Sequence, residues 1–385
     1  MATNYSPLTI NRHLDARLRS IQTAAIQGDA ARQELGGLLQ HALQLEFATI
    51  PPYLSAVFSL TTANTKISEL ILRAAIEEML HMTAVANLMN AIGVAPDIVA
   101  AVPDYPCQLT ILDPPLKLDL RSFSYDLVKD LFMQIETPED PVHYPMALAA
   151  GRPRTIGQFY EGIIEIIDRD TIPGLFDHAT RDAYKQRKVV PNFRPIAYLS
   201  NRDTDTYPLK NDINFRITDK VSAVRHLRWV VGQGEGTAPF NPLTAEGIPA
   251  HFYRFESIIK QRFLIKDERV KTLGYSFSGG DLPFDETGVH EFRTNAKTAD
   301  FDAYPTVSRQ MTRFNDYYAS MINALQQAFN CPAPDQQAQA KAAYDDAMAT
   351  MQTMPNVASA IIQSAQQKGV KAGIPFEFPK PPSIS

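Results

Sequence analysis

The chain has 385 residues, 45% of them hydrophobic and 21% charged, as expected for a soluble globular protein of one large domain or two of ordinary size. The net charge is −5 without a basic cluster along any predicted helix, so we expect neither nucleic acid nor an acidic membrane surface as a partner. The two cysteines, Cys107 and Cys331, are too few for a disulfide framework or a thiolate metal cluster. With no visible signal peptide or membrane-spanning apolar run, we expect a cytoplasmic location.

The first strong periodicity predicts a helix over residues 32–60. We expect the adjacent Pro51 and Pro52 to kink or break it, with a short helical continuation through Leu60. Its inward stripe is read as Leu39, Leu43, Glu46 and Ile50.

A second predicted helix covers residues 67–93, with Gly93 as its C-terminal stop. The stripe that should face the core contains Ile71, Ala74, Glu78, His81, Val85 and Leu88. Glu77, next to this stripe, is expected to point elsewhere and to be dispensable for metal binding.

The rest of the chain alternates between irregular segments and helices. Residues 94–153 are proline-rich, with one short helix expected in 123–140, and residues 171–216 form a long excursion of little periodicity. Further helices are expected at 155–170, 217–231, 250–264, 306–330 and 337–367. Thr155 is the expected N-cap of the first of these, and Thr218 or Asp219 that of the second. We therefore predict a mainly helical protein with a bundle in 1–265, insertions at about 94–153 and 171–216, and a C-terminal extension, 266–385, whose two helices pack on the bundle.

Two carboxylates and an imidazole occupy positions that helical periodicity assigns to the core. Glu46 lies on the first stripe, and Glu78 and His81 are neighbours one turn apart on the second. A buried carboxylate needs a partner, because desolvating its charge costs several kcal/mol. Helix bundles that hold two metal ions use one Glu from each of two helices and a Glu-x-x-His pair from each of two others. Such ligands suit iron or manganese.

The remaining donors of such a site are less regular in the sequence. Glu161 is our candidate on the third helix, with Glu165 one turn further along the same polar stripe. Glu235 and His251 are the candidates from the fourth helix, although a Gly/Pro-containing interruption must loop out between them. A solvated face, or a core histidine satisfied by hydrogen bonds, would produce the same patterns without metal. No phosphate-binding or dinucleotide motif is present, so no nucleotide cofactor is expected.

Several motifs together resemble the ferritin-like domain of the iminophenyl-pyruvate dimer synthases, the imine-dimerising family of violacein biosynthesis. They are LLQHALQLEFATIPPYLSAVFS, AAIEEMLHMTAVANLMNAIG, TIGQFYEGI, GQGEGT and HFYRFESI, with RFNDYYASMINALQQAFN, AMATMQTM and AGIPFEF near the C-terminus. The resemblance implies a ferritin-like four-helix bundle. It also implies the ligand set Glu46, Glu78, His81, Glu161, Glu235 and His251 for two iron or manganese ions. We expect no haem, because the chain has nothing of the size of the haem-type portion that the violacein-pathway enzyme carries. One departure is Gly232, where the family often has glutamate.

The leading hypothesis from the sequence is a dimetal oxidase or oxygenase of secondary metabolism. Its substrate would be a small amino-acid-derived or aryl-pyruvate-imine metabolite, used together with dioxygen, and the chain could form a homo-oligomer. One alternative is a metal enzyme of such metabolites without oxygen chemistry. The other is a metal-free scaffold or interaction module.

Overall fold

The computed structural model describes residues 8–138, 155–188, 216–235, 241–245, 247–270 and 274–379; the side chain of Glu235 lies outside this description. The longer helices are α1 (Arg12–Gln22), α2 (Gly28–Ser59), α3 (Thr65–Ala91), α7 (Ile156–Asp168), α9 (Lys220–Glu235), α10 (His251–Lys260), α11 (Pro305–Phe329) and α12 (Gln337–Lys368). The predicted mainly helical architecture is confirmed. Among the described residues, no helix is both long enough and apolar enough to cross a membrane.

Short elements connect these helices. The short helices are α4 (Ile98–Ala101), α5 (Tyr125–Leu127), α6 (Met133–Ile135) and α8 (Asp177–Arg181), with a π-helical turn η2 (Val128–Phe132) and 3-10 turns η1 (Thr62–Asn64), η3 (Ala183–Lys185), η4 (Glu286–Gly288), η5 (Thr298–Phe301) and η6 (Pro334–Gln336). Three antiparallel strand pairs are formed by β1 (Thr9–Ile10) with β3 (Leu112–Asp113), β2 (Cys107–Leu109) with β4 (Leu116–Leu118), and β5 (Ile265–Lys266) with β6 (Tyr275–Ser276). The pairs are too short to form a structural layer, so packing of the helices determines the fold.

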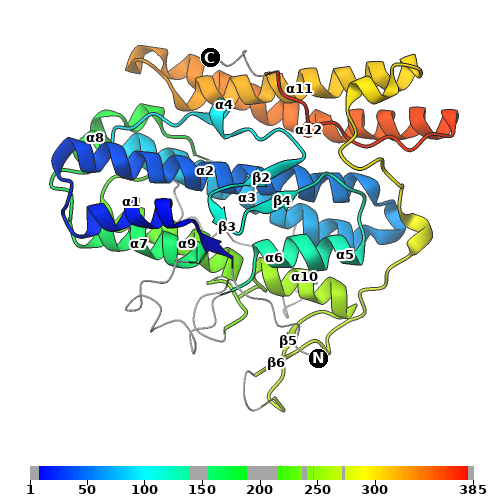
Figure 1. Ribbon diagram of the computed structural model, residues 1–385, viewed down its shortest axis with the longest axis horizontal. Coiled ribbons are helices and arrows are strands. Elements are labelled where there is room, and N and C mark those ends of the chain that lie inside the picture. Colours follow the sequence, from blue (N-terminus) through cyan, green and yellow to red (C-terminus); the bar gives the residue numbers. More distant parts are fainter. Residues whose placement is uncertain are drawn as a thin grey trace.

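The long helices α2 and α3 lie side by side through the centre of the molecule (Figure 1). Below them, α1, α7 and α9 occupy one end, while α5, α6 and α10 occupy the other. The α11–α12 pair packs above, against α4, α3 and α2. One end of each of the four shorter helices α6, α7, α9 and α10 therefore lies beneath the middle of the central pair.

The predicted break at Pro51 and Pro52 is wrong, because α2 continues through both residues. Proline cannot donate the backbone hydrogen bond that would normally reach the carbonyl four residues earlier. The carbonyl of Ala48, which Pro52 leaves without its helical donor, instead accepts a hydrogen bond from the buried hydroxyl of Tyr105 at 2.7 Å. A side chain from the irregular segment after α4 thus replaces the missing donor.

Other helix boundaries follow from local chemistry that the sequence did reveal. Gly93 has φ +78° just beyond the end of α3, the left-handed conformation that glycine adopts readily. Thr155 accepts from the backbone N–H of Gln158 at 3.1 Å, and the Gln158 side chain accepts from the Thr155 N–H at 3.2 Å. This reciprocal capping box confirms the predicted start of α7. At α9, Asp219 Oδ1 accepts from the Ser222 N–H at 2.8 Å, as expected for the predicted cap.

Some expectations are modified or fall outside the described residues. Helix α1 was not predicted, and α9 extends through Gly232 and Gly234 to Glu235, beyond its expected end. Residues 139–153 and 189–215 of the two expected insertions lie outside the described part of the chain. The domain boundary near residue 265 stays a prediction.

Candidate metal centre

Five carboxylate and imidazole side chains converge where the short helices meet α2 and α3. Glu46 comes from α2, and Glu78 and His81 come from α3. Glu136 directly follows α6, and His251 is the first residue of α10. All five are buried, with exposed fractions from 0% for His251 to 8% for Glu136. Such burial of ionisable groups requires compensating partners or a bound cation.

Glu78 divides the cluster into two overlapping groups. Glu46, Glu78 and His81 form one, Glu78, Glu136 and His251 form the other, and the ligand atoms within each group lie within 4.8 Å of one another. His81 Nδ1 lies 3.4 Å from Glu78 Oε2, whereas His251 Nδ1 lies 2.9 Å from Glu78 Oε1. Each oxygen of Glu78 therefore faces a different histidine, as a bridging carboxylate would.

One further carboxylate completes each group. Glu46 Oε2 lies 3.3 Å from His81 Nδ1, and Glu136 Oε1 lies 3.4 Å from His251 Nδ1. A tyrosine hydroxyl also donates to each of them: Tyr160 to Glu46 Oε1, and Tyr53 to Glu136 Oε1 at 2.7 Å. Because each tyrosine uses one lone pair of its carboxylate, it fixes how the carboxylate is oriented toward the histidine.

The far nitrogen of each imidazole has its own hydrogen-bond partner. His81 Nε2 lies 2.9 Å from Gln233 Oε1 of α9, and His251 Nε2 lies 2.8 Å from Glu77 Oε2. Since both acceptors take an N–H from Nε2, Nδ1 is the nitrogen that faces the carboxylates, and loss of its proton would leave a lone pair there for a metal ion. Ligating histidines in metalloproteins are commonly held in this way.

The carboxylates and imidazoles perturb one another strongly. Burial raises the pKa of Glu46 to about 7, although His81 opposes this shift. Burial would also raise the pKa of Glu78, but His81 and His251 outweigh it and hold that pKa well below its usual range. Burial lowers the pKa of His81, but Glu78 and Glu46 more than reverse this and raise it to about 10. A cation placed among these groups would compete with the protons that they hold.

The residues present fit a pair of metal ions. Nδ1 of the buried His251 lies 2.9 Å from Glu78 Oε1 and 3.4 Å from Glu136 Oε1. Although burial opposes it, these carboxylates raise the pKa of His251 well above its usual value, so a proton holds this group together and a cation could take the place of that proton. Each group has two carboxylates and one imidazole, with Glu78 shared between the groups, and this donor set suits iron or manganese.

A small cavity of about 60 Å³ opens onto the cluster. It reaches Glu46, Glu78, His81 and Glu136. The remaining lining residues are mostly apolar or glycine and include Leu45, Ile135, Ile156, Gly157, Val230, Val231 and Gly234. A Cβ on Gly234 would lie only 3.2 Å from Glu136 Oε2, so glycine leaves room for this carboxylate beside α9. The cavity can hold a few water molecules or a diatomic molecule.

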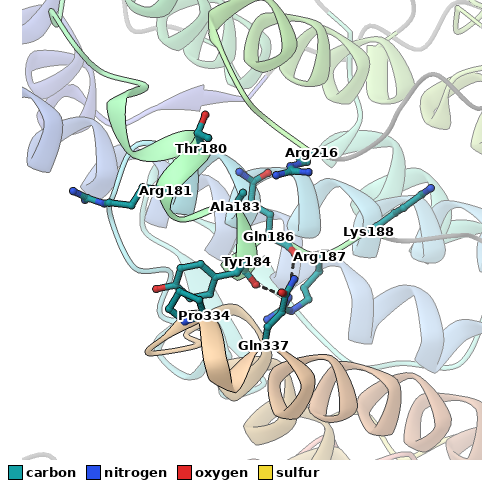
Figure 2. A pocket seen from close by; sticks show the side chains of 10 residues that line it. All are labelled: Thr180, Arg181, Ala183, Tyr184, Gln186, Arg187, Lys188, Arg216, Pro334 and Gln337. Atoms are coloured by element: carbon teal, nitrogen blue, oxygen red, sulfur yellow. Dashed lines mark hydrogen bonds between the residues drawn. The ribbon is translucent and has the colours of Figure 1, made fainter.

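A larger cavity, of about 480 Å³, lies between η3 and the start of α12 (Figure 2). It contains several cationic side chains, but Arg181 and Lys188 point away from each other in Figure 2. Arg187 donates to the backbone carbonyls of Tyr184 and Gln186. The cationic groups that line the cavity do not converge on one point, so we assign no chemistry to this cavity.

The structure brings four of the six predicted ligands together: Glu46, Glu78, His81 and His251. It does not bring Glu161 to them, because Glu161 lies on the exposed side of α7. Glu235 ends α9, but its side chain lies outside the described residues. The assignment of any of the six as a metal ligand stays a prediction.

Glu136 and Glu77 are the residues that the sequence analysis misplaced. Glu136, which was not predicted, takes the place in the cluster that we expected for Glu161. Glu77 does not point away from the site, because it is 0% exposed and contacts His251. The expectation that Glu77 points away from the cluster is therefore wrong, and its dispensability for metal binding stays a prediction.

Comparison with known proteins places this geometry in a family. A family profile described as "Ferritin-like" matches residues 39–260. The crystal structure of a ferritin-like protein from Caulobacter vibrioides aligns with 90% of this chain and 97% of its own, at a TM-score of 0.51 and 20% identity. That similarity concerns the fold alone, and no curated protein matches the sequence. Since the profile covers more than half of the sequence, including most of α2 and all of α3, α7, α9 and α10, the chain belongs to the ferritin-like family.

Proposed function

We propose that this ferritin-like protein binds two iron or manganese ions at the cluster of Glu46, Glu78, His81, Glu136 and His251. It would use these ions to oxidise a small organic metabolite with dioxygen. One observation carries the proposal: Glu78 directs one oxygen toward each of two histidine-containing groups. Three acidic side chains gathered in low dielectric repel one another unless protons or cations compensate their charge. Two metal ions would replace the protons that the raised pKa values of Glu46 and His81 keep in the cluster.

The chain's own residues would have distinct roles. Glu78 would bridge the two positions, Glu46 and Glu136 would each bind at one of them, and His81 and His251 would supply one nitrogen each. When bound, a redox-active metal pair supplies electrons for the reduction of dioxygen. The apolar walls of the 60 Å³ cavity would limit the access of water to the same face of the cluster.

The finer identity of the substrate rests on the sequence resemblance. The violacein-pathway imine-dimerising family acts on aryl-pyruvate imines, so we propose an amino-acid-derived imine or a related small metabolite. The described cavity is too small for an aromatic substrate beside the cluster.

Metal analysis of the purified chain tests the proposal. We expect two iron or manganese ions per chain in the wild type and loss of both in a Glu78→Ala/His81→Ala variant. Glu161→Gln is the matched control, because this exposed carboxylate lies outside the cluster and its loss should leave the metal content unchanged. A metal-free wild type of full thermal stability would refute the dimetal proposal and favour a scaffold or interaction module.

Oxygen consumption then separates redox from non-redox chemistry. The iron-loaded protein should consume dioxygen in the presence of candidate arylpyruvate imines, and the Glu78→Ala/His81→Ala variant should not. A protein that retains two ions but consumes no oxygen with these or related amino-acid-derived substrates would favour a metal enzyme without oxygen chemistry.

A further inference from the structure

The two histidines of the cluster differ in the hydrogen-bond partner of their Nε2 atoms. His81 Nε2 faces the neutral amide oxygen of Gln233, while His251 Nε2 faces the carboxylate of Glu77. We infer that the two metal positions are inequivalent: Glu77 makes the His251 position the tight one, and the His81 position exchanges its ion more readily. This inference rests on the proposed dimetal function.

Glu77 is itself held rigidly. Its Oε1 accepts from Arg73 Nε at 2.8 Å, and its Oε2 accepts from Arg254 Nη1 at 2.5 Å. Both arginines are buried, with exposed fractions of 3% and 0%. Arg254 is fixed in turn, because its Nε donates to the Pro249 carbonyl at 2.6 Å. The carboxylate therefore cannot rotate away from His251 without leaving two buried guanidinium groups unpaired with it.

A carboxylate and an amide differ as partners of a ligating histidine. The hydrogen bond from an imidazole N–H to a carboxylate is charge-assisted, and it increases the electron density on the opposite ring nitrogen. Glu77 should therefore make His251 Nδ1 a stronger ligand than His81 Nδ1, which is supported by the Gln233 amide alone. Glu77 acts through His251 and is a positioning residue.

The two metal positions also differ in their access to the 60 Å³ cavity. The 60 Å³ cavity is lined by His81 but not by His251, which is 0% exposed. Tyr160, which donates to Glu46, also lines this cavity, whereas Tyr53, which donates to Glu136, is packed against Phe132 and Phe255. Glu78 and Glu136 also line the cavity, but of the two histidines only His81 does. An ion at the His81 position would therefore be more accessible to small molecules in the cavity than an ion at the His251 position.

Titration of the metal-free full-length chain with Co²⁺, followed by visible absorption and by calorimetry, measures the two positions separately. We expect two binding steps in the wild type, with dissociation constants that differ by about 10-fold or more. Glu77→Gln should weaken the tight step by about 10- to 100-fold, as is typical for loss of a hydrogen-bond partner of a ligating histidine. The weak step should be unchanged.

Gln233 offers a reciprocal test that keeps Glu77 and both arginines intact. Gln233→Glu gives His81 a carboxylate partner, so it should strengthen the weak step by about 10-fold and leave the tight step unchanged. This variant decides the inference even where Glu77→Gln fails to fold. An effect confined to one of the two steps distinguishes positioning of a single histidine from general destabilisation, which would weaken both.

The outcomes separate this inference from the proposed function. A chain that binds no Co²⁺, iron or manganese refutes the proposed function itself. A chain that binds two ions with equal affinity leaves the dimetal proposal standing and overturns the inequivalence. Equal weakening of both steps in Glu77→Gln, or no strengthening of the weak step in Gln233→Glu, would also overturn it.

Discussion

Replacing Tyr105 with phenylalanine should destabilise the protein through the helix that carries Glu46. The Tyr105 hydroxyl is the donor that replaces the backbone N–H missing at Pro52, and its bond to the Ala48 carbonyl is buried. Tyr105→Phe leaves that carbonyl unsatisfied in an apolar environment. The cost of an unsatisfied buried polar group is about 1–3 kcal/mol, so we expect the free energy of unfolding to fall by about this amount.

A second buried tyrosine supplies the control. The Tyr318 hydroxyl is also buried, but it has no hydrogen-bond partner among the described residues. Tyr318→Phe removes the same oxygen without orphaning an acceptor, so its effect should stay within about 0.5 kcal/mol or be stabilising. Urea unfolding of both variants, monitored by circular dichroism, gives the comparison.

A double-mutant cycle tests the cause. Pro52→Ala restores a backbone N–H that can bond to the Ala48 carbonyl, so Tyr105→Phe should cost about 1 kcal/mol less in that background than in the wild type. The reasoning is refuted if Tyr105→Phe costs no more than Tyr318→Phe. It is also refuted if the cost is the same with and without the proline.

Three further outcomes are expected. Thr155→Ala removes the N-cap of α7 and should cost about 1 kcal/mol in urea unfolding, whereas Thr353→Ala, which removes only an exposed hydroxyl bonded within α12, should stay within about 0.5 kcal/mol. Burial lowers the pKa of His226 below its ordinary 6.5, so the folded state binds this proton less readily than the unfolded state. The free energy of unfolding should therefore fall as the pH is lowered through 6.5, by at most about 1.4 kcal/mol at pH 5.5. His226→Gln should remove this component, and equal pH dependence in the two proteins would contradict the assignment. Glu136→Gln should reduce the metal content from two ions to one without changing the helical circular dichroism signal, and retention of both would exclude Glu136 as a ligand.

The parts of the site carried by long helices could be predicted from periodicity. Helices α2 and α3 each present a repeated apolar stripe, and Glu46, Glu78 and His81 interrupt these stripes at positions facing the core. Two such interruptions on consecutive antiparallel helices must lie close together once the stripes pack. His251 could be proposed because it begins a helix on the inner side of the bundle.

Glu136 could not be found in this way. It follows three short helical pieces, α5, η2 and α6, and the middle piece is a π-helix. A π-helical turn shifts the register of the residues after it, so a 3.6-residue period no longer indicates which residues face the core. Glu161 was preferred on its helix because Gly157 lies one turn before it and Ile164 follows, although α7 turns Glu161 toward solvent.

Glu77 was misplaced for a different reason, and that reason supports its role. Periodicity divides a helix into an inward and an outward face, but α3 is buried on nearly all sides at the level of the site. Arg73, one turn before Glu77, was the available signal, because a buried glutamate of such a helix needs a cation nearby. Buried ion pairs contribute little net stability compared with apolar packing. The Arg73–Glu77–Arg254 network is therefore better explained by the orientation of His251 than by the stability of the bundle.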